Sequence, residues 1–233
     1  MGQVGRVLGV DGCRAGWVGV VLAPDGLVGG VFGARIAEVV DAAVAVAGEL
    51  DVVGVDMPLH LSDEGHRGCD LAAKHHLGVK GASLFVTPPA PALAAVTYAA
   101  GCAVARELTG KAPSRQAWAL RAKVLELGAW WRSATCGVHE VHPEVSFSLM
   151  VGAPIAARKT SWAGVAARRA ALPAEGIEVP DDIGPAGRLA GVDDVLDAAA
   201  VAWTARRIAA GTARTFPHPP VELTGGRLQA IWA

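Results

Sequence analysis

The chain reads VLGVDGCRAG over residues 7–16, an apolar run that ends in one carboxylate and a glycine-rich turn. A strand that is apolar on both faces is typical of the middle of a sheet, so Asp11 is expected to emerge near the sheet's centre. The glycines would let backbone, metal or phosphate approach closely. Taken alone, Asp11 also fits a turn residue that caps Gly12, so its role depends on partners elsewhere in the chain.

Composition indicates a globular protein without a strong charge bias. The 233 residues are 52% apolar, which suits one large domain or a domain with an insertion. The 21 basic and 22 acidic residues leave a net charge of -1, which offers no general attraction for a long polyanion. The four scattered cysteines form no C-x-x-C pair, as expected for a reducing cytosol.

The sequence predicts a cytoplasmic protein without membrane contact. Asp11 lies where a signal peptide would need its apolar core. Arg6 breaks the myristoylation pattern. Apolar runs such as residues 42–50 are too short to cross a bilayer.

The first quarter of the chain predicts a small sheet with one crossover helix. Apolar periodicity and turn residues place strands over 17–22 and 27–32, a helix over 34–50 and a fourth strand over 51–56. Because a strand–helix–strand crossover is right-handed, the fourth strand should lie parallel beside the first. Asp56, at its end, would then neighbour Asp11.

Residues 61–132 predict a helical insertion between two strands of the sheet. Helical stretches are expected over 92–108 and 115–131, after a loop rich in glycine and proline. We interpret Arg67 as a solvated surface residue rather than a phosphate ligand. The apolar helices of the insertion would either cover the site or form a homodimer.

A further strand is expected over 137–147, and it carries ionisable residues. Alternation places Glu140 and His142 on the same side, and Pro143 ends the regular pairing. A histidine flanked by Glu140 and Glu144 is explained better by a metal or a general base than by a core position.

A helix over 193–208 begins with three aspartates. Asp193 and Asp194 are ordinary complements of the helix dipole. Asp197 lies three residues after Asp194 and four residues after Asp193, which puts at least two carboxylates on one helix face. Like charges on one face repel each other unless a cation lies between them.

Two segments flank this helix. Lys159 precedes a predicted helix over 162–172, which Thr160 and Ser161 are well placed to cap. The segment around residues 216–226 predicts a loop-rich tail, with Ile231 and Trp232 docked on the body of the protein.

These elements bring carboxylates to one edge of the sheet. Hard oxygen ligands without paired thiols select Mg²⁺ or Mn²⁺ over zinc. Two such ions about 4 Å apart would activate water and stabilise the leaving oxygen in a phosphodiester displacement. The candidate metal ligands are Asp11, Asp56, Asp194 and Asp197. The candidate catalytic set adds Glu140 and His142, and the candidate substrate-binding residues are Arg14 and Lys159.

Several blocks of the chain resemble those of a known family. They cover residues 9–17, 55–58, 85–91, 111–116, 140–147, 159–160 and 193–198. They are similar to the signature blocks of an uncharacterised bacterial and archaeal family labelled predicted ribonuclease H-like nuclease. By motif, the resemblance carries over the acidic positions Asp11, Asp56, Glu140, Glu144, Asp194 and Asp197.

The resemblance implies one ribonuclease H-like α/β domain over residues 1–233. Its sheet would be mixed, with an antiparallel N-terminal meander and parallel central strands, flanked by helices and interrupted by the insertion. The chain departs from the pattern at Ala90, where a basic residue is expected, and this weakens the expectation that the proline-rich loop binds phosphate.

Three functions are open at this point. The first is a two-metal nuclease acting on short or structured DNA or RNA, with Asp11 and Asp56 as bridging ligands and His142 or Glu140 orienting the water. The second is a nucleotide hydrolase or phosphotransferase of the actin and sugar-kinase type, although the chain lacks room for the usual duplicated domain. The third is a non-catalytic ribonuclease H-like scaffold.

Overall fold

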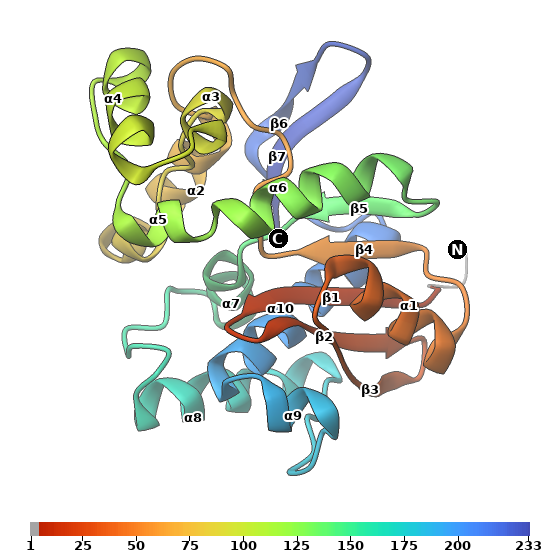
Figure 1. Cartoon of the computed structure of the whole chain (residues 1–233). Helices are drawn as coiled ribbons and strands as arrows, with labels where there is room; N and C mark the ends of the chain where they lie inside the picture. The colour runs from red at the N-terminus through yellow and green to blue at the C-terminus, as the bar shows by residue number, and fades with distance from the viewer. Residues whose placement is uncertain (1–4) are drawn as a thin grey trace.

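The computed structural model describes residues 5–233, and at its centre lies a five-stranded mixed sheet in the order β3-β2-β1-β4-β5 (Figure 1). The first three strands form an antiparallel meander, and the last two run parallel to β1. The predicted pairing of the fourth strand with the first is confirmed, with Val55 opposite Val10. The strands are β1 (Val7–Cys13), β2 (Gly16–Ala23), β3 (Gly26–Gly33), β4 (Val52–Val55) and β5 (Gly137–Glu140).

Helices cover both faces of β1, which explains why its residues are apolar on both sides. Leu8 and Val10 pack with α1 (Ile36–Ala47) and α6 (Arg121–Trp130) on one face. Val7 packs with α10 (Val192–Ala209) on the other face. Strand alternation gives Asp11 the same face as Val7, so its carboxylate is directed toward the α10 side of the sheet.

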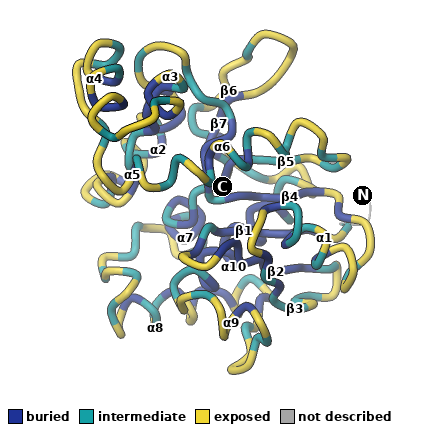
Figure 2. The backbone as a smooth tube through the Cα atoms, viewed as in Figure 1, coloured by how far each residue is buried: buried dark blue, intermediate teal, exposed yellow. Residues whose placement is uncertain are grey.

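Glycine in β1 allows α10 to approach unusually closely. A Cβ atom built on Gly9 would lie 2.0 Å from the backbone nitrogen of Ala202. The facing side of α10 is rich in alanine, and its residues 198–202 are fully buried. Figure 2 shows that β1 and α10 are buried, whereas much of α4 is exposed.

The insertion between β4 and β5 is helical, as predicted, and α2 to α5 gather beyond one end of the sheet (Figure 1). Each long helix expected there is divided in two. Thr97 accepts a hydrogen bond from the backbone N–H of Ala100 and so caps a new helix. The elements are α2 (Gly68–Leu77), η1 (Gly78–Ser83), α3 (Ala90–Ala94), α4 (Tyr98–Thr109), α5 (Arg115–Ala119), α6 and η2 (Trp131–Ser133).

The strand predicted over 137–147 is shorter than expected. It ends at Glu140, and Pro143 occupies the first turn of α7 (Pro143–Val151). Proline suits this position because its missing N–H has no helical partner there. Beyond it lie α8 (Trp162–Ala171), η3 (Pro173–Glu175) and α9 (Pro185–Leu189).

The prediction of a loop-rich tail was wrong. Residues there form a β-hairpin of β6 (Thr215–Leu223) and β7 (Arg227–Trp232). The ladder is irregular between Phe216 and Val221, a segment with three prolines that cannot donate to it. The docking of the C-terminus is confirmed, because Ile231 is buried and Trp232 forms a bridge with Val141.

No helix within residues 5–233 combines the length and the apolar character that a membrane crossing requires.

Candidate metal centre

Three aspartates from three separate elements meet beside the ends of β1 and β4. Asp11 lies on β1, Asp56 directly follows β4, and Asp197 lies in the second turn of α10. One carboxylate oxygen of each lies within 4.8 Å of the others. Oxygen ligands on opposite sides of a Mg²⁺ ion are about 4.2 Å apart, given Mg–O distances of 2.0–2.1 Å. The spacing therefore suits a shared divalent cation after small side-chain adjustments.

The backbone explains why these three side chains converge. The parallel pairing of β1 with β4 continues one residue past the end of β4, where the N–H of Asp56 donates to the carbonyl of Val10 at 2.9 Å. This bond sets Asp56 beside Asp11. The close approach of α10 over Gly9 brings Asp197 to the same place.

Burial and mutual repulsion disfavour the charged forms of these carboxyl groups. Burial and the neighbouring charge of Asp56 raise the pKa of Asp11 well above its ordinary value. Burial and the charge of Asp197 raise the pKa of Asp56 to about 8. Burial raises the pKa of Asp197 to about 6, even though Lys159 acts in the opposite direction. A bound divalent cation would relieve this repulsion and displace the protons.

Lys159, a candidate substrate-binding residue from the sequence, contacts the acidic centre. Its Nζ lies 2.6 Å from Oδ2 of Asp197 and 3.6 Å from Oδ2 of Asp193. The other oxygen of Asp197, Oδ1, is buried and has no hydrogen-bond partner among the described residues. Asp197 therefore has one oxygen bound to an ammonium group and one oxygen free to accept a ligand.

The three aspartates line a cleft of about 730 Å³ together with His142. Burial lowers the pKa of His142 to about 4, so the imidazole is neutral at neutral pH. Its Nδ1 is buried and has no hydrogen-bond partner within residues 5–233. A neutral imidazole with a free nitrogen can bind a water or accept a proton.

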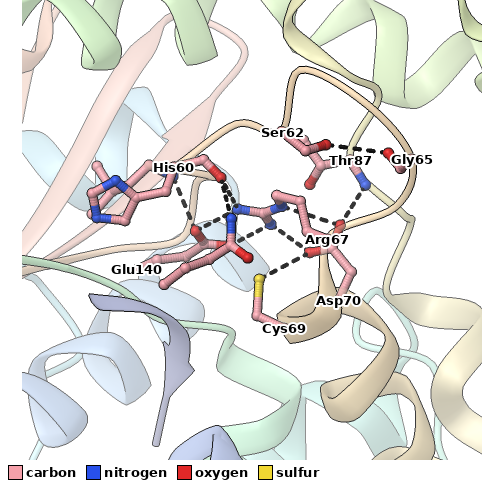
Figure 3. A network of polar contacts seen from close by, with 10 residues as sticks. His60, Ser62, Gly65, Arg67, Cys69, Asp70, Thr87 and Glu140 are labelled. Carbon is pink, nitrogen blue, oxygen red and sulfur yellow. Dashed lines mark hydrogen bonds and ion pairs between the residues drawn. The ribbon is translucent and has the colours of Figure 1, made fainter. Parts of the chain in front are cut away.

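Glu140 was expected to act with His142, but the structure places its carboxylate in a different network (Figure 3). Its oxygens accept hydrogen bonds from Nη1 and Nη2 of Arg67, at 2.7 and 2.6 Å. It also accepts the N–H of Leu59 at 3.0 Å. Because Arg67 and Leu59 already bind this carboxylate, we leave Glu140 out of the proposed catalytic set.

Arg67 is buried, which corrects its interpretation as a solvated surface residue. Only 2% of it is exposed, and it pairs with Asp70 as well as Glu140. Asp70 in turn accepts the backbone N–H of Thr87 at 2.7 Å. The ion pair joins residues 73 positions apart, and the only local signal was the i,i+3 spacing of Arg67 and Asp70.

Two other predicted site residues do not belong to the group of three aspartates. Asp194 lines the cleft, but its Oδ2 accepts the N–H of Gly191 at 3.0 Å and caps α10. Arg14 is exposed on the turn after β1 and is not among the described residues that line the cleft. Glu144 lines the cleft and pairs with Arg168 at 2.6 Å.

Comparison with known proteins identifies one family. A family model described as "Protein of unknown function (DUF429)" matches residues 9–222. The matched region contains all three aspartates, Lys159 and His142. No curated protein and no solved structure matches the chain.

Proposed function

The chain belongs to the DUF429 family of proteins of unknown function, and we propose that it hydrolyses phosphodiester bonds in nucleic acid with a divalent metal ion. The observation that carries this proposal is the convergence of Asp11, Asp56 and Asp197 on one wall of an open cleft. Three carboxylates without a thiol or a paired imidazole suit Mg²⁺ or Mn²⁺. Asp197 adds a buried oxygen that has no hydrogen-bond partner in residues 5–233, and a metal ion would satisfy it.

Asp11, Asp56 and Asp197 would hold the metal. When bound, it supplies Lewis acidity that polarises a phosphoryl oxygen. In the hydrolysis, the oxygen of a water forms a bond to phosphorus while the bond from phosphorus to the departing ester oxygen breaks. His142 orients that water or accepts its proton, and the departing oxygen gains a proton from solvent.

The topology of the sheet supports a ribonuclease H-like arrangement, which the sequence resemblance implied. The acidic residues lie on β1, after β4 and on the C-terminal helix, in a sheet of order β3-β2-β1-β4-β5. That distribution is the one on which the two-metal nuclease hypothesis was based.

The dimensions and the charge of the cleft favour a short or structured nucleic acid. Its volume of about 730 Å³ and the net charge of -1 do not suit a long duplex. Lys80 and Arg158 line the cleft, and within residues 5–233 neither forms a salt bridge. They are therefore the cations most available to substrate phosphates.

The turn after β1 gives the phosphotransferase alternative less support than the acidic centre gives the nuclease. That hypothesis needs Gly12 and the residues that follow to approach a phosphate. A Cβ atom at Gly12 would lie 2.9 Å from Cδ of Lys123 and 3.1 Å from Cε of Met57. Lys123 also donates to the carbonyl of Gly16 at 2.6 Å, so its side chain covers this turn.

Metal binding and cleavage test the proposal together. Wild-type protein is titrated with Mn²⁺ by calorimetry, beside Asp11→Asn, Asp56→Asn and the exposed control Asp41→Asn. Labelled single-stranded, duplex and branched oligonucleotides, and separately ATP, are then incubated with Mn²⁺. We expect Mn²⁺ binding and oligonucleotide cleavage by wild type and Asp41→Asn, and loss of both in the two site variants.

Two results would contradict the proposal. If Asp11→Asn binds Mn²⁺ as well as wild type, the acidic centre is not a metal site and the scaffold hypothesis is favoured. If ATP is hydrolysed and every oligonucleotide stays intact, the phosphotransferase class replaces the nuclease.

A further inference from the structure

We infer that the ammonium group of Lys159 occupies one of two cation positions in the acidic centre, so that the protein binds a single divalent ion there. The inference rests on the proposed metal site and differs from the two-ion expectation drawn from the sequence. It assigns Lys159 a fixed place beside the metal rather than a general role in attracting substrate.

Asp197 is the residue that would join the two cations. Its Oδ2 lies 2.6 Å from Nζ of Lys159, while its Oδ1 is buried and unpaired among the described residues. In two-metal sites the ions lie about 3.5–4 Å apart and share ligands. Asp197 would act as such a shared ligand, because one of its oxygens binds Lys159 and its Oδ1, unpaired within residues 5–233, could accept a metal ion held with Asp11 and Asp56.

The segment that carries Lys159 is held in place by its own hydrogen bonds. The carbonyl of Arg158 accepts from the N–H of Ser161 at 2.9 Å and from its hydroxyl at 2.7 Å. Ser161 also caps α8 by accepting the N–H of Gly164 at 3.1 Å. A Cβ atom at Gly164 would lie 1.8 Å from the carbonyl oxygen of Arg158, so the turn packs tightly against the helix.

The charges around the acidic centre are compatible with one divalent ion beside Lys159. Asp11, Asp56 and Asp197 bring three negative charges when ionised, which one divalent ion and the Lys159 ammonium neutralise. Asp193, whose Oδ2 lies 3.6 Å from Nζ of Lys159, and Asp194 lie in the first turn of α10, where the helix dipole favours negative charge.

Lys159 is also positioned to face the substrate. Its side chain is 39% exposed and lines the cleft, unlike the almost fully buried carboxylate of Asp197. An ammonium group binds phosphate as a compact point charge. Lys159 would therefore stabilise negative charge on the phosphate at the position where a second metal ion would otherwise act.

The number of Mn²⁺ ions bound per chain tests the inference. Wild type, Lys159→Met, Lys159→Arg and the exposed control Lys111→Met are titrated by calorimetry, and the saturated proteins are examined by electron paramagnetic resonance. We expect one ion in wild type, Lys159→Arg and Lys111→Met. Lys159→Met should take up two ions and show the spectrum of a magnetically coupled pair.

The possible results separate this inference from the proposed function. Two coupled ions in the wild type would overturn the role of Lys159 and leave the metal-dependent function standing. A single ion in Lys159→Met, with an affinity equal to that of wild type, would overturn it as well. Failure of wild type to bind Mn²⁺ at all would contradict the proposed function and this inference together. The wild-type measurement can overturn the inference whether or not any variant folds, and Lys159→Arg, which keeps the positive charge, shows whether substitution at this position is tolerated.

Discussion

At the scale of single residues, the environment of each carboxyl group decides what it can do. Asp56 follows β4 and Glu140 ends the neighbouring parallel strand β5, yet their surroundings differ. Asp56 lies with two other aspartates, whereas Glu140 is neutralised by the buried guanidinium of Arg67. The first is therefore suited to bind a cation, and the second is suited to hold the fold together.

The raised pKa of Asp56 predicts how stability depends on pH without metal. Because the pKa is about 8 in the folded protein against 3.8 ordinarily, the folded state binds this proton more tightly than the unfolded state. The resulting stabilisation is complete below pH 3.8 and is lost as pH rises through about 8. Urea unfolding in EDTA should therefore show a midpoint that falls as pH rises from about 5 to 8.

Asp56→Asn provides the matched comparison, because asparagine keeps the shape of the side chain and does not ionise. We expect its stability in EDTA to vary less with pH over the same range and to exceed that of wild type at pH 8 and above. Added Mn²⁺ should stabilise wild type and not the variant. Equal pH dependence of the two proteins would show that Asp56 does not titrate as described.

At the scale of elements, the Arg67 network connects the insertion to the sheet. Arg67 precedes α2, Glu140 ends β5, and Asp70 holds the backbone of Thr87 (Figure 3). A buried ion network of this kind contributes little net stability when complete, but its disruption leaves charges without partners. Its function here is to set the position of the residues that follow β4.

Arg67→Met should therefore destabilise the protein by about 3–5 kcal/mol, since two buried carboxylates lose their partner. The control is Arg35→Met, which breaks an exposed pair with Glu38 and should cost less than about 1 kcal/mol. Denaturant unfolding measures both values. A cost for Arg67→Met as small as that of the control would mean that the network is not buried as described.

Glu140→Gln separates this structural role from catalysis. If Glu140 acts only through Arg67, the variant should be less stable than wild type but should still bind Mn²⁺ with the same stoichiometry and similar affinity. Calorimetry at a temperature where the variant remains folded gives the result. Loss of Mn²⁺ binding by a folded variant would show that Glu140 contributes to the metal site.

The packing of α10 on β1 is the other element-scale feature on which the site depends. A side chain at Gly9 would collide with backbone atoms of α10, which cannot rotate away as a side chain can. Gly9→Ala should therefore cost at least about 2 kcal/mol in unfolding free energy. It should also weaken Mn²⁺ binding, because Asp197 moves with α10 away from Asp11.

Gly29→Ala is the matched control for this change. Gly29 lies in β3, and no atom lies within 4 Å of a Cβ atom placed there. Thermal unfolding and Mn²⁺ titration should show lower stability and weaker Mn²⁺ binding for Gly9→Ala, and values close to those of wild type for Gly29→Ala. Normal metal binding by a destabilised Gly9→Ala protein would separate the packing of α10 from the formation of the site.

At the scale of the whole molecule, charge limits how nucleic acid could bind. The net charge is -1, and Lys80 and Arg158 are the cleft cations without a salt bridge in the described part of the chain. Phosphate contacts from Lys80 and Arg158 to a single strand predict a slope of about -1.4 for log affinity against log salt, and a third contact from Lys159 would make it about -2.1. Such a shallow slope is characteristic of local binding rather than of an extended basic surface.

Fluorescence anisotropy with a labelled single-stranded oligonucleotide measures this slope, with Ca²⁺ in place of Mn²⁺ to prevent cleavage. Lys80→Met and Arg158→Met should each make the slope less negative by about 0.7. Lys111→Met should leave it unchanged. A slope several times steeper in wild type would indicate a binding surface outside the cleft.

The sequence by itself determined the central strands, the parallel pairing of β4 with β1 and the aspartate-bearing helix α10. These features depend on apolar periodicity, which is visible within a short segment of sequence, and on the right-handedness of strand–helix–strand crossovers, which is general. For the same reason Asp11, Asp56, Asp194 and Asp197 could be named as candidate metal ligands from the sequence, although the choice between Asp194 and Asp197 stayed open. The match to the family of unknown function spans all of these positions.

Only the tertiary structure decided which of the remaining polar residues face the site. Glu140 and Asp194 resemble metal ligands in the sequence. In the structure, the carboxylate of Glu140 accepts hydrogen bonds from the buried Arg67, and that of Asp194 caps α10 by accepting the N–H of Gly191. The hairpin β6–β7 was missed because its prolines disfavour a strand and its pairing is non-local. Lys159 meets Asp197 across 38 positions of sequence, a contact that depends on how α8 and α10 pack rather than on any local pattern.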